Sequence, residues 1–91
     1  MAGKGYEDAI ISEHAASQMA RRGISVALLK GVLRNPEQAV EVRPGRVILQ
    51  SRTRIGPHNQ LIRVFVDVDV PPAQVVTVYR TSKIDKYWSE Q

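Results

Sequence analysis

The sequence predicts an α+β domain in which two N-terminal helices pack on a four-stranded antiparallel sheet, followed by a short C-terminal helical turn. Two observations support this fold class. Segments 13–22 and 26–34 place apolar residues at helical spacing, whereas segment 61–70 alternates apolar and polar residues like a half-buried strand. Segment 75–81 follows two prolines and is rich in β-branched residues, so it is expected to return as the antiparallel partner of segment 61–70.

The chain has 91 residues, which suffices for one domain and is too short for two. We expect residues 1–11 to be a flexible lead-in and residues 12–91 to be a single domain. The sequence lacks cysteine, so it has no disulfide, thiol nucleophile or thiolate metal site. It has no apolar run near the roughly 20 residues that span a membrane, and residues 1–6 lack the apolar centre of a signal peptide. We therefore expect a cytoplasmic protein with no membrane partner.

Short polar residues mark the ends of both helices. Ser12 is expected to cap the first helix and Gly23 to end it, because a serine hydroxyl accepts from free backbone N–H groups and glycine adopts the left-handed conformation. Ser25 is expected to cap the second helix, which must stop before Pro36. So short a link predicts a helical hairpin or corner.

The strands are expected to follow the second helix in meander order. Segment 39–42 is a short strand, and a turn at Pro44 and Gly45 leads to a longer strand over residues 46–54. A loop over residues 55–59 then leads to the hairpin of segments 61–70 and 75–81. Ser82 is expected to cap the last helical turn over residues 83–88.

The net charge of +4 lies entirely in the strand-rich half of the chain. Residues 1–42 carry five basic and five acidic side chains, whereas residues 43–91 carry eight basic and four acidic ones. Six of those eight are arginines, whose planar fork matches a phosphate in two contacts. A single arginine here can be a solvated charge at the sheet edge or part of an ion pair, such as Arg46 with Asp69. The excess of positive charge in the whole group is better explained by a polyanionic partner.

The sheet face opposite the helices is expected to carry a set that mixes phosphate-binding forks with aromatic rings. On a strand whose even residues face the core, Arg63 and Phe65 face outward with Tyr79 and Thr81 of the next strand, and Arg52 joins them. Rings on such a face offer platforms for single-stranded bases. The alternative is a cross-strand pair of Phe65 and Tyr79 that only stabilises the sheet, or one covered by Trp88.

A second polar group lies on the first helix. His14, Gln18 and Arg22 are spaced by four residues, so they form one stripe beside the buried one and place an imidazole in line with a guanidinium. A lone histidine on a helix is more often structural than catalytic, and this alternative stays open.

Together these segments resemble a known family. The stretches HAASQMARRGIS, NPE, LIRVFVDV and VVTVYRTSKIDKYW resemble a small bacterial family of unknown function with the motif H-A-x-x-R-M-x-x-R-G-I, grouped with the RelE and BrnT toxins. The resemblance covers nearly the whole chain after Ile10 and implies a RelE-like fold. It also implies metal-independent RNA cleavage, on the ribosome or off it, that an antitoxin protein inhibits. The chain departs from the motif at Gln18, where the motif has arginine.

Metal-independent cleavage of RNA needs a base for the ribose 2′-OH, an acid for the leaving oxygen and cations for the phosphorane. We predict that His14 is an acid or base, that Arg22 and Arg63 bind phosphate, and that Tyr79 stacks on a base or relays a proton. The residues do not decide which pair is acid and base. No metal or cofactor is expected. The further residues predicted to contact RNA are Gln18, Arg52, Arg54, Phe65, Arg80, Thr81, Lys83 and Lys86.

Two other functions stay open at this level. The same arginine face fits a module that binds RNA without cleaving it, which the glutamine at position 18 favours. Alternatively, the outward apolar residues Ile48, Phe65 and Trp88 form a protein contact patch of an interaction module.

Overall fold

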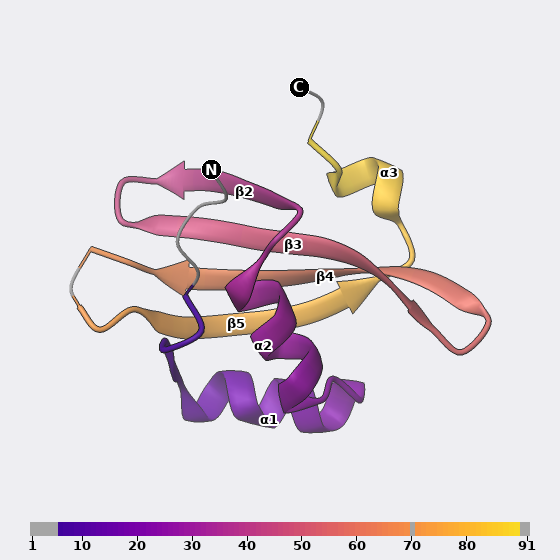
Figure 1. Cartoon of the computed structure of the whole chain (residues 1–91), viewed down its shortest axis with the longest axis horizontal. Coiled ribbons are helices and arrows are strands. Elements are labelled where there is room, and N and C mark those ends of the chain that lie inside the picture. The colour runs from indigo at the N-terminus through magenta and orange to yellow at the C-terminus, as the bar shows by residue number, and fades with distance from the viewer. Residues whose placement is uncertain (1–5, 70, 90–91) are drawn as a thin grey trace.

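The computed structural model describes residues 6–69 and 71–89, which form an α+β domain with one sheet and three helices (Figure 1). The elements, in chain order, are β1 (Ile10–Ile11), α1 (Glu13–Arg22), α2 (Val26–Arg34), β2 (Gln38–Arg43), β3 (Arg46–Ile55), β4 (His58–Asp67), β5 (Gln74–Thr81) and α3 (Ile84–Tyr87). None of the described helices has the length and apolar character needed to cross a bilayer.

The sheet is mixed and five-stranded, with the strand order β1-β5-β4-β3-β2. Strands β2 to β5 form the antiparallel meander that the sequence predicts, but β1 adds a parallel strand beside β5. The prediction of four antiparallel strands is therefore wrong in its count. The reason is the free edge of β5, where the Ala73 and Val75 carbonyls accept from the backbone N–H groups of Ile10 (2.8 Å) and Ser12 (3.1 Å). Residues 10–11 of the predicted lead-in thus belong to the sheet.

The predicted helix caps are confirmed. The Ser12 hydroxyl accepts from the Ala15 N–H and the Ser25 hydroxyl accepts from the Leu28 N–H, both at 3.0 Å. Gly23 ends α1 with φ at +66°, in the left-handed region that glycine adopts without strain. Both helices begin and end where these local signals place them.

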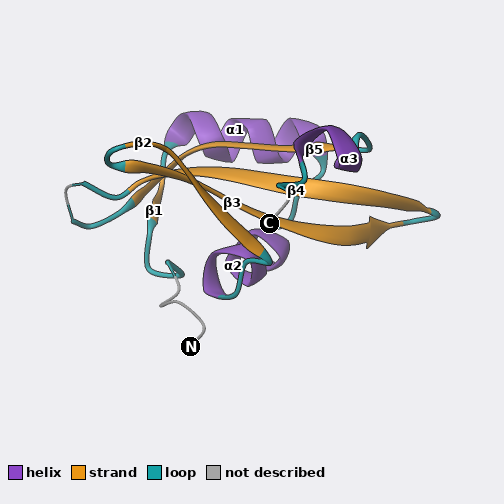
Figure 2. Cartoon of the chain, turned by 90° about the horizontal axis from the view of Figure 1, so that it is seen from above, coloured by secondary structure: helices purple, strands orange, loops and turns teal. Residues whose placement is uncertain are grey.

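The two N-terminal helices lie in different places on the sheet. Figure 1 shows α2 in front of the central strands and α1 alongside β5, and Figure 2 shows α2 on one side of the sheet and α3 on the other. We call these the helix side and the strap side. The strap is residues 84–89, which comprise α3 and the two residues after it.

The apolar core lies on the helix side. Ile62, Val64 and Val66 of β4 have no exposed surface and pack with the equally buried Leu29 and Leu33 of α2. A β-bulge shifts the register between Phe65 and Val66, so that Val66 pairs with Val75. For that reason Val75 and Val78, which regular strand alternation would place on opposite sides of the sheet, both point into the core.

Three local predictions need correction. The turn between β3 and β4 is shorter than the predicted loop 55–59, because the strands extend to Ile55 and His58 and pair there. Ser82 does not cap the last helix, which follows Lys83 without a side-chain cap. On the strap side, Ile48 and Leu61 are buried rather than exposed.

Candidate nucleic-acid interface

Arg63 lies at the centre of the strap side. The register of the sheet places it opposite Gln50 of β3 and Tyr79 of β5, so all three side chains point to the same side. The Arg63 Nε donates to the Gln50 Oε1 at 3.0 Å, and its Nη1 donates to the Tyr79 hydroxyl. The guanidinium carbon lies 4.4 Å from the ring centroid of Tyr87 in the strap. A half-buried cation is thus held by neutral groups.

Three aromatic rings surround this guanidinium. Its central carbon lies 5.7 Å from the Phe65 centroid and 5.6 Å from the Tyr79 centroid, within the range in which a cation is attracted to a ring face. Phe65 and Tyr79 pair across the strands with centroids 6.2 Å apart, and Tyr79 meets Tyr87 edge to face at 6.3 Å. We call Arg63, Phe65, Tyr79 and Tyr87 the arginine cluster.

Two glutamines attach the strap to the sheet. Gln50 is fully buried, and its Nε2 donates to the Gln38 Oε1 (2.7 Å) and to the Tyr87 carbonyl (3.1 Å). Gln38 in turn donates to the Ser89 carbonyl at 2.8 Å and accepts from the Ser89 N–H at 3.0 Å. One of these hydrogen bonds joins the two glutamine side chains to each other. The other three join a glutamine side chain to the backbone of the strap. Neither glutamine is predicted from the sequence as an anchor of the strap, because an amide on a strand gives no signal of a distant partner.

A second arginine lies beside the cluster. Arg52 donates to both carboxylate oxygens of Glu37, at 3.1 and 3.2 Å, and its backbone N–H donates to the same carboxylate at 2.7 Å. These hydrogen bonds hold the pKa of the Glu37 carboxyl below its ordinary value. The Arg52 guanidinium carbon lies 4.1 Å from the centroid of the Trp88 ring. Trp88 therefore stacks on Arg52 and does not cover Phe65 and Tyr79 as the sequence suggested.

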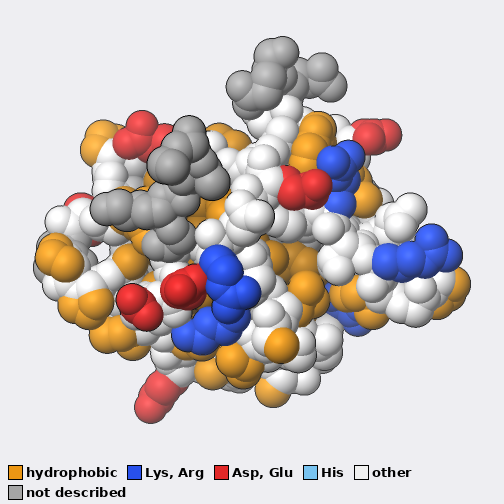
Figure 3. Space-filling model, in the orientation of Figure 1, with side chains coloured by type: hydrophobic (Ala, Val, Ile, Leu, Met, Phe, Trp, Pro, Cys, Tyr) orange, Lys and Arg blue, Asp and Glu red, His pale blue; other side chains and the backbone are white. Residues whose placement is uncertain are grey.

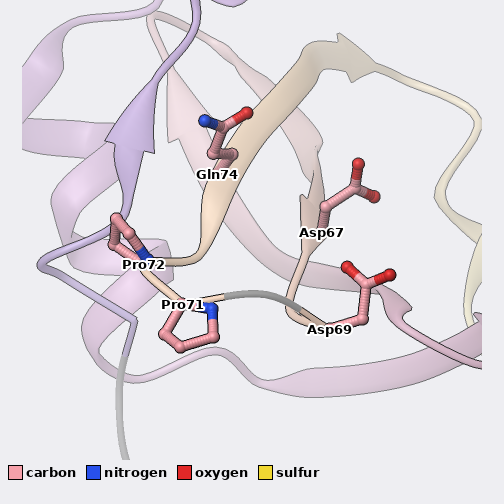
Figure 4. A pocket seen from close by; sticks show the side chains of 5 residues that line it. All are labelled: Asp67, Asp69, Pro71, Pro72 and Gln74. Carbon is pink, nitrogen blue, oxygen red and sulfur yellow. The ribbon is translucent and has the colours of Figure 1, made fainter.

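The opposite end of the sheet is acidic. Arg46 pairs through two hydrogen bonds with Asp67, not with Asp69 as the sequence suggested. Figure 4 shows a hollow here, in which both carboxylates lie beside two prolines and Gln74. Its charge is opposite to what a phosphate needs. The part of the chain that the structure describes also holds no group of three or more His, Cys, Asp or Glu side chains suited to a metal ion.

The remaining predicted RNA contacts fall into two sets. Arg54 is exposed on the strap side of β3, and Thr81, Lys83 and Lys86 lie around the start of the strap. Arg80 is exposed but pairs with Ile62, which faces the helix side, so it lies outside this surface. Figure 3, which views the helix side, shows Lys and Arg side chains in separate small groups, some of them beside acidic ones, and no continuous basic patch.

Two residues of the predicted helical stripe bond the backbone of the neighbouring edge strand. The Gln18 Oε1 accepts from the Val78 N–H at 3.0 Å, and the Arg22 Nη1 donates to the Val78 carbonyl at 2.8 Å. These two side chains therefore close the edge of β5 beyond β1. His14 is exposed, and no hydrogen bond or ion pair among the described residues joins it to Arg63. The residues predicted as catalytic thus divide into a pair in the arginine cluster, Arg63 and Tyr79, and a pair on α1.

Comparison with known families agrees with one part of the sequence prediction. The family model "Domain of unknown function (DUF4258)" matches residues 11–80. The chain belongs to the DUF4258 family. No curated protein and no solved structure matches it. The DUF4258 match includes Gln38, Gln50, Arg63 and Tyr79 and ends before the strap.

Proposed function

We propose that this DUF4258 domain binds single-stranded RNA on the strap side of its sheet. The observation that carries the proposal is the environment of Arg63, a half-buried guanidinium whose hydrogen-bond partners are an amide and a phenol. Among the described residues it has no carboxylate within ion-pair distance, whereas Arg46 and Arg52 each have one. A cation held in place without a counter-ion attracts an anion, and its planar fork matches phosphate.

The surroundings of Arg63 extend the same chemistry. Lys83 and Lys86 are exposed at the start of the strap, and with Arg52 they line a hollow that Asp85 also borders. Arg54 continues the basic row on β3. A single strand that follows this row would place its phosphates against cations and its bases against Phe65 and Tyr79. Duplexes keep their bases stacked inside, so the rings favour a single strand.

The salt dependence of binding tests this proposal. A labelled single-stranded RNA of about ten nucleotides, within the usual footprint of such surfaces, is titrated and its fluorescence anisotropy is measured. Contact with about four phosphates predicts that affinity falls about fifty-fold between 50 and 200 mM salt. Affinity that does not change with salt would contradict a phosphate-binding surface.

Substitution of Arg63 tests the residue itself. Arg63→Ala is expected to weaken binding at least about tenfold, because a hydrogen bond to a charged group contributes about 1.5–3 kcal/mol. Arg34→Ala is the control for net charge, because it removes one positive charge from α2, across the sheet from Arg63. Unlike Arg63, Arg34 forms an ion pair, with Glu7. Circular dichroism confirms that both variants fold. Equal losses in both variants would show that only net charge matters.

A second candidate function is metal-independent cleavage of the bound RNA, as the resemblance to the RelE and BrnT toxins implies. The hydrogen bond from Arg63 to the Tyr79 hydroxyl favours it, because a phenol beside a phosphate ligand is placed to donate a proton. In this reaction the ribose 2′-oxygen attacks phosphorus and the bond to the 5′-oxygen breaks. The phenol protonates the leaving 5′-oxygen and a base removes the 2′ proton, which leaves a 2′,3′-cyclic phosphate. An antitoxin protein would then be the natural partner of this cytoplasmic domain.

Two measurements test cleavage separately from binding. Induced expression should arrest growth of a bacterial host and produce RNA fragments that end in a cyclic phosphate. Tyr79→Phe keeps the ring and removes the hydroxyl, so it should lose about 10²- to 10⁴-fold in rate while RNA affinity falls little. His14→Ala should cleave at the parent rate, because His14 makes no described contact with the arginine cluster. Normal growth with soluble expression would leave RNA binding as the only function.

A further inference from the structure

The strap lies on the surface that the proposed function requires. It places two consecutive aromatic residues on two arginines, with the Tyr87 ring over Arg63 and the Trp88 ring over Arg52, at 4.4 and 4.1 Å. Nucleobases stack on guanidinium planes in the same way when a protein binds a single strand. The strap therefore occupies the places that two neighbouring bases would take.

The hydrogen bonds that attach the strap can be replaced by hydrogen bonds to water or to RNA. It forms no strand ladder with the sheet in the described part of the chain, and Gln38 and Gln50 hold its backbone at Tyr87 and Ser89. Side-chain amides that release a backbone carbonyl or N–H can bond water or the edge of a base instead. The hydrophobic core lies on the other side of the sheet, so it does not depend on these bonds.

We propose that the strap gates this surface: Tyr87 and Trp88 mimic two stacked bases, and a dinucleotide step of single-stranded RNA displaces them from Arg63 and Arg52. The inference rests on the proposed function and adds a regulatory step to it. The docked strap lowers RNA affinity, because RNA must first break the strap's contacts with the glutamines and the arginines. Substitutions in the strap or at Gln38 that weaken those contacts should therefore strengthen RNA binding.

The chain contains a reporter for this movement, because Trp88 is its only tryptophan. The experiment uses the full chain and an oligoadenylate of about eight nucleotides, and it measures quenching of Trp88 fluorescence by acrylamide. Saturating RNA is expected to raise the quenching constant at least about twofold beyond any direct quenching by the bases, since the indole leaves the Arg52 surface. Trp88 that stays equally protected in saturated complex would overturn the gate and leave RNA binding standing.

Two variants test the gate from both partners. Gln38→Ala removes both bonds to Ser89, and Ser89→Pro removes the N–H that donates to Gln38 without changing the sheet. Both are expected to raise Trp88 quenching without RNA and to tighten RNA binding several-fold. Gln60→Ala is the matched control, because Gln60 is a half-buried glutamine on the helix side of β4.

The outcomes separate the two proposals. Released Trp88 with weaker RNA binding would make the strap part of the binding surface and overturn the gate. Unchanged quenching and affinity in both variants would also overturn it. If neither the parent nor the variants bind RNA at low salt, the proposed function itself is wrong, and the gate with it.

Discussion

The two sides of the sheet are held together by different forces. On the helix side, Ile62, Val64 and Val66 meet apolar residues of α2, and burial alone makes the contact favourable. The strap side buries fewer apolar residues, and Gln50 and Arg63 there contact the strap through directed hydrogen bonds and an aromatic ring. Apolar burial gains free energy roughly in proportion to area, whereas a hydrogen bond exchanged with water gains little. The helix side thus suits a permanent core, and the strap side suits a surface that can change partners.

The largest effect is expected on the helix side. Leu33 is fully buried, and Leu33→Ala leaves a cavity there. The substitution should lower the free energy of unfolding by about 2–5 kcal/mol, as measured by urea denaturation. Leu28→Ala, at a half-buried position of the same helix, is the control and should cost clearly less. Equal costs would mean that α2 packs less tightly than the structure shows.

A smaller effect is expected at the centre of the strap side. Gln50→Ala removes the amide that bonds Gln38, Tyr87 and Arg63, so three polar groups lose a partner. We expect a cost of about 1–3 kcal/mol, because water reaches these groups once the strap loosens. Thermal denaturation measures the cost, with Gln60→Ala as control. A loss as large as that of Leu33→Ala would show that the strap belongs to the permanent core and contradict the contrast between the two sides.

The smallest effect concerns the ion pair of Arg46 and Asp67 at the acidic end. Hydrogen bonding to Arg46 lowers the pKa of the Asp67 carboxyl, so the pair stabilises the fold above the ordinary carboxyl pKa. That contribution is lost as the pH falls through the lowered pKa. Both side chains are about one-third exposed, so Arg46→Ala should cost at most about 1 kcal/mol at neutral pH. The difference from the parent should shrink as the pH falls below the ordinary carboxyl pKa of about 3.9, and a difference that stays constant through this acid range would rule out the electrostatic origin.

The limits of the sequence prediction follow the same contrast. The ends of the helices are predictable because their signals are local. Ser12 and Ser25 accept from backbone N–H groups three residues further on, and Gly23 ends α1 by its own left-handed conformation. The alternation of β4 likewise identified the side that carries Arg63 and Phe65. These signals are local, so the sequence contains them directly.

The missed features depend on residues distant in the chain. β1 is a two-residue strand that forms because β5 offers free carbonyls, and no local pattern marks it. Gln18 bonds Val78, and Gln38 bonds Ser89, across 60 and 51 residues. The division of the predicted catalytic set, with Arg22 at the edge of β5 and Arg63 under the strap, has the same origin. Such pairings require the three-dimensional arrangement.

Binding of RNA at Arg63 is tested most directly by the side-chain Nε–Hε signal of this arginine in a nitrogen–proton correlation spectrum. The signal is assigned by its loss in Arg63→Lys, and the protein is titrated with oligoadenylate. We predict that the Arg63 signal shifts and saturates with the RNA while the Arg34 signal, from across the sheet, stays in place. An Arg63 signal that is unchanged while RNA binds would contradict the account.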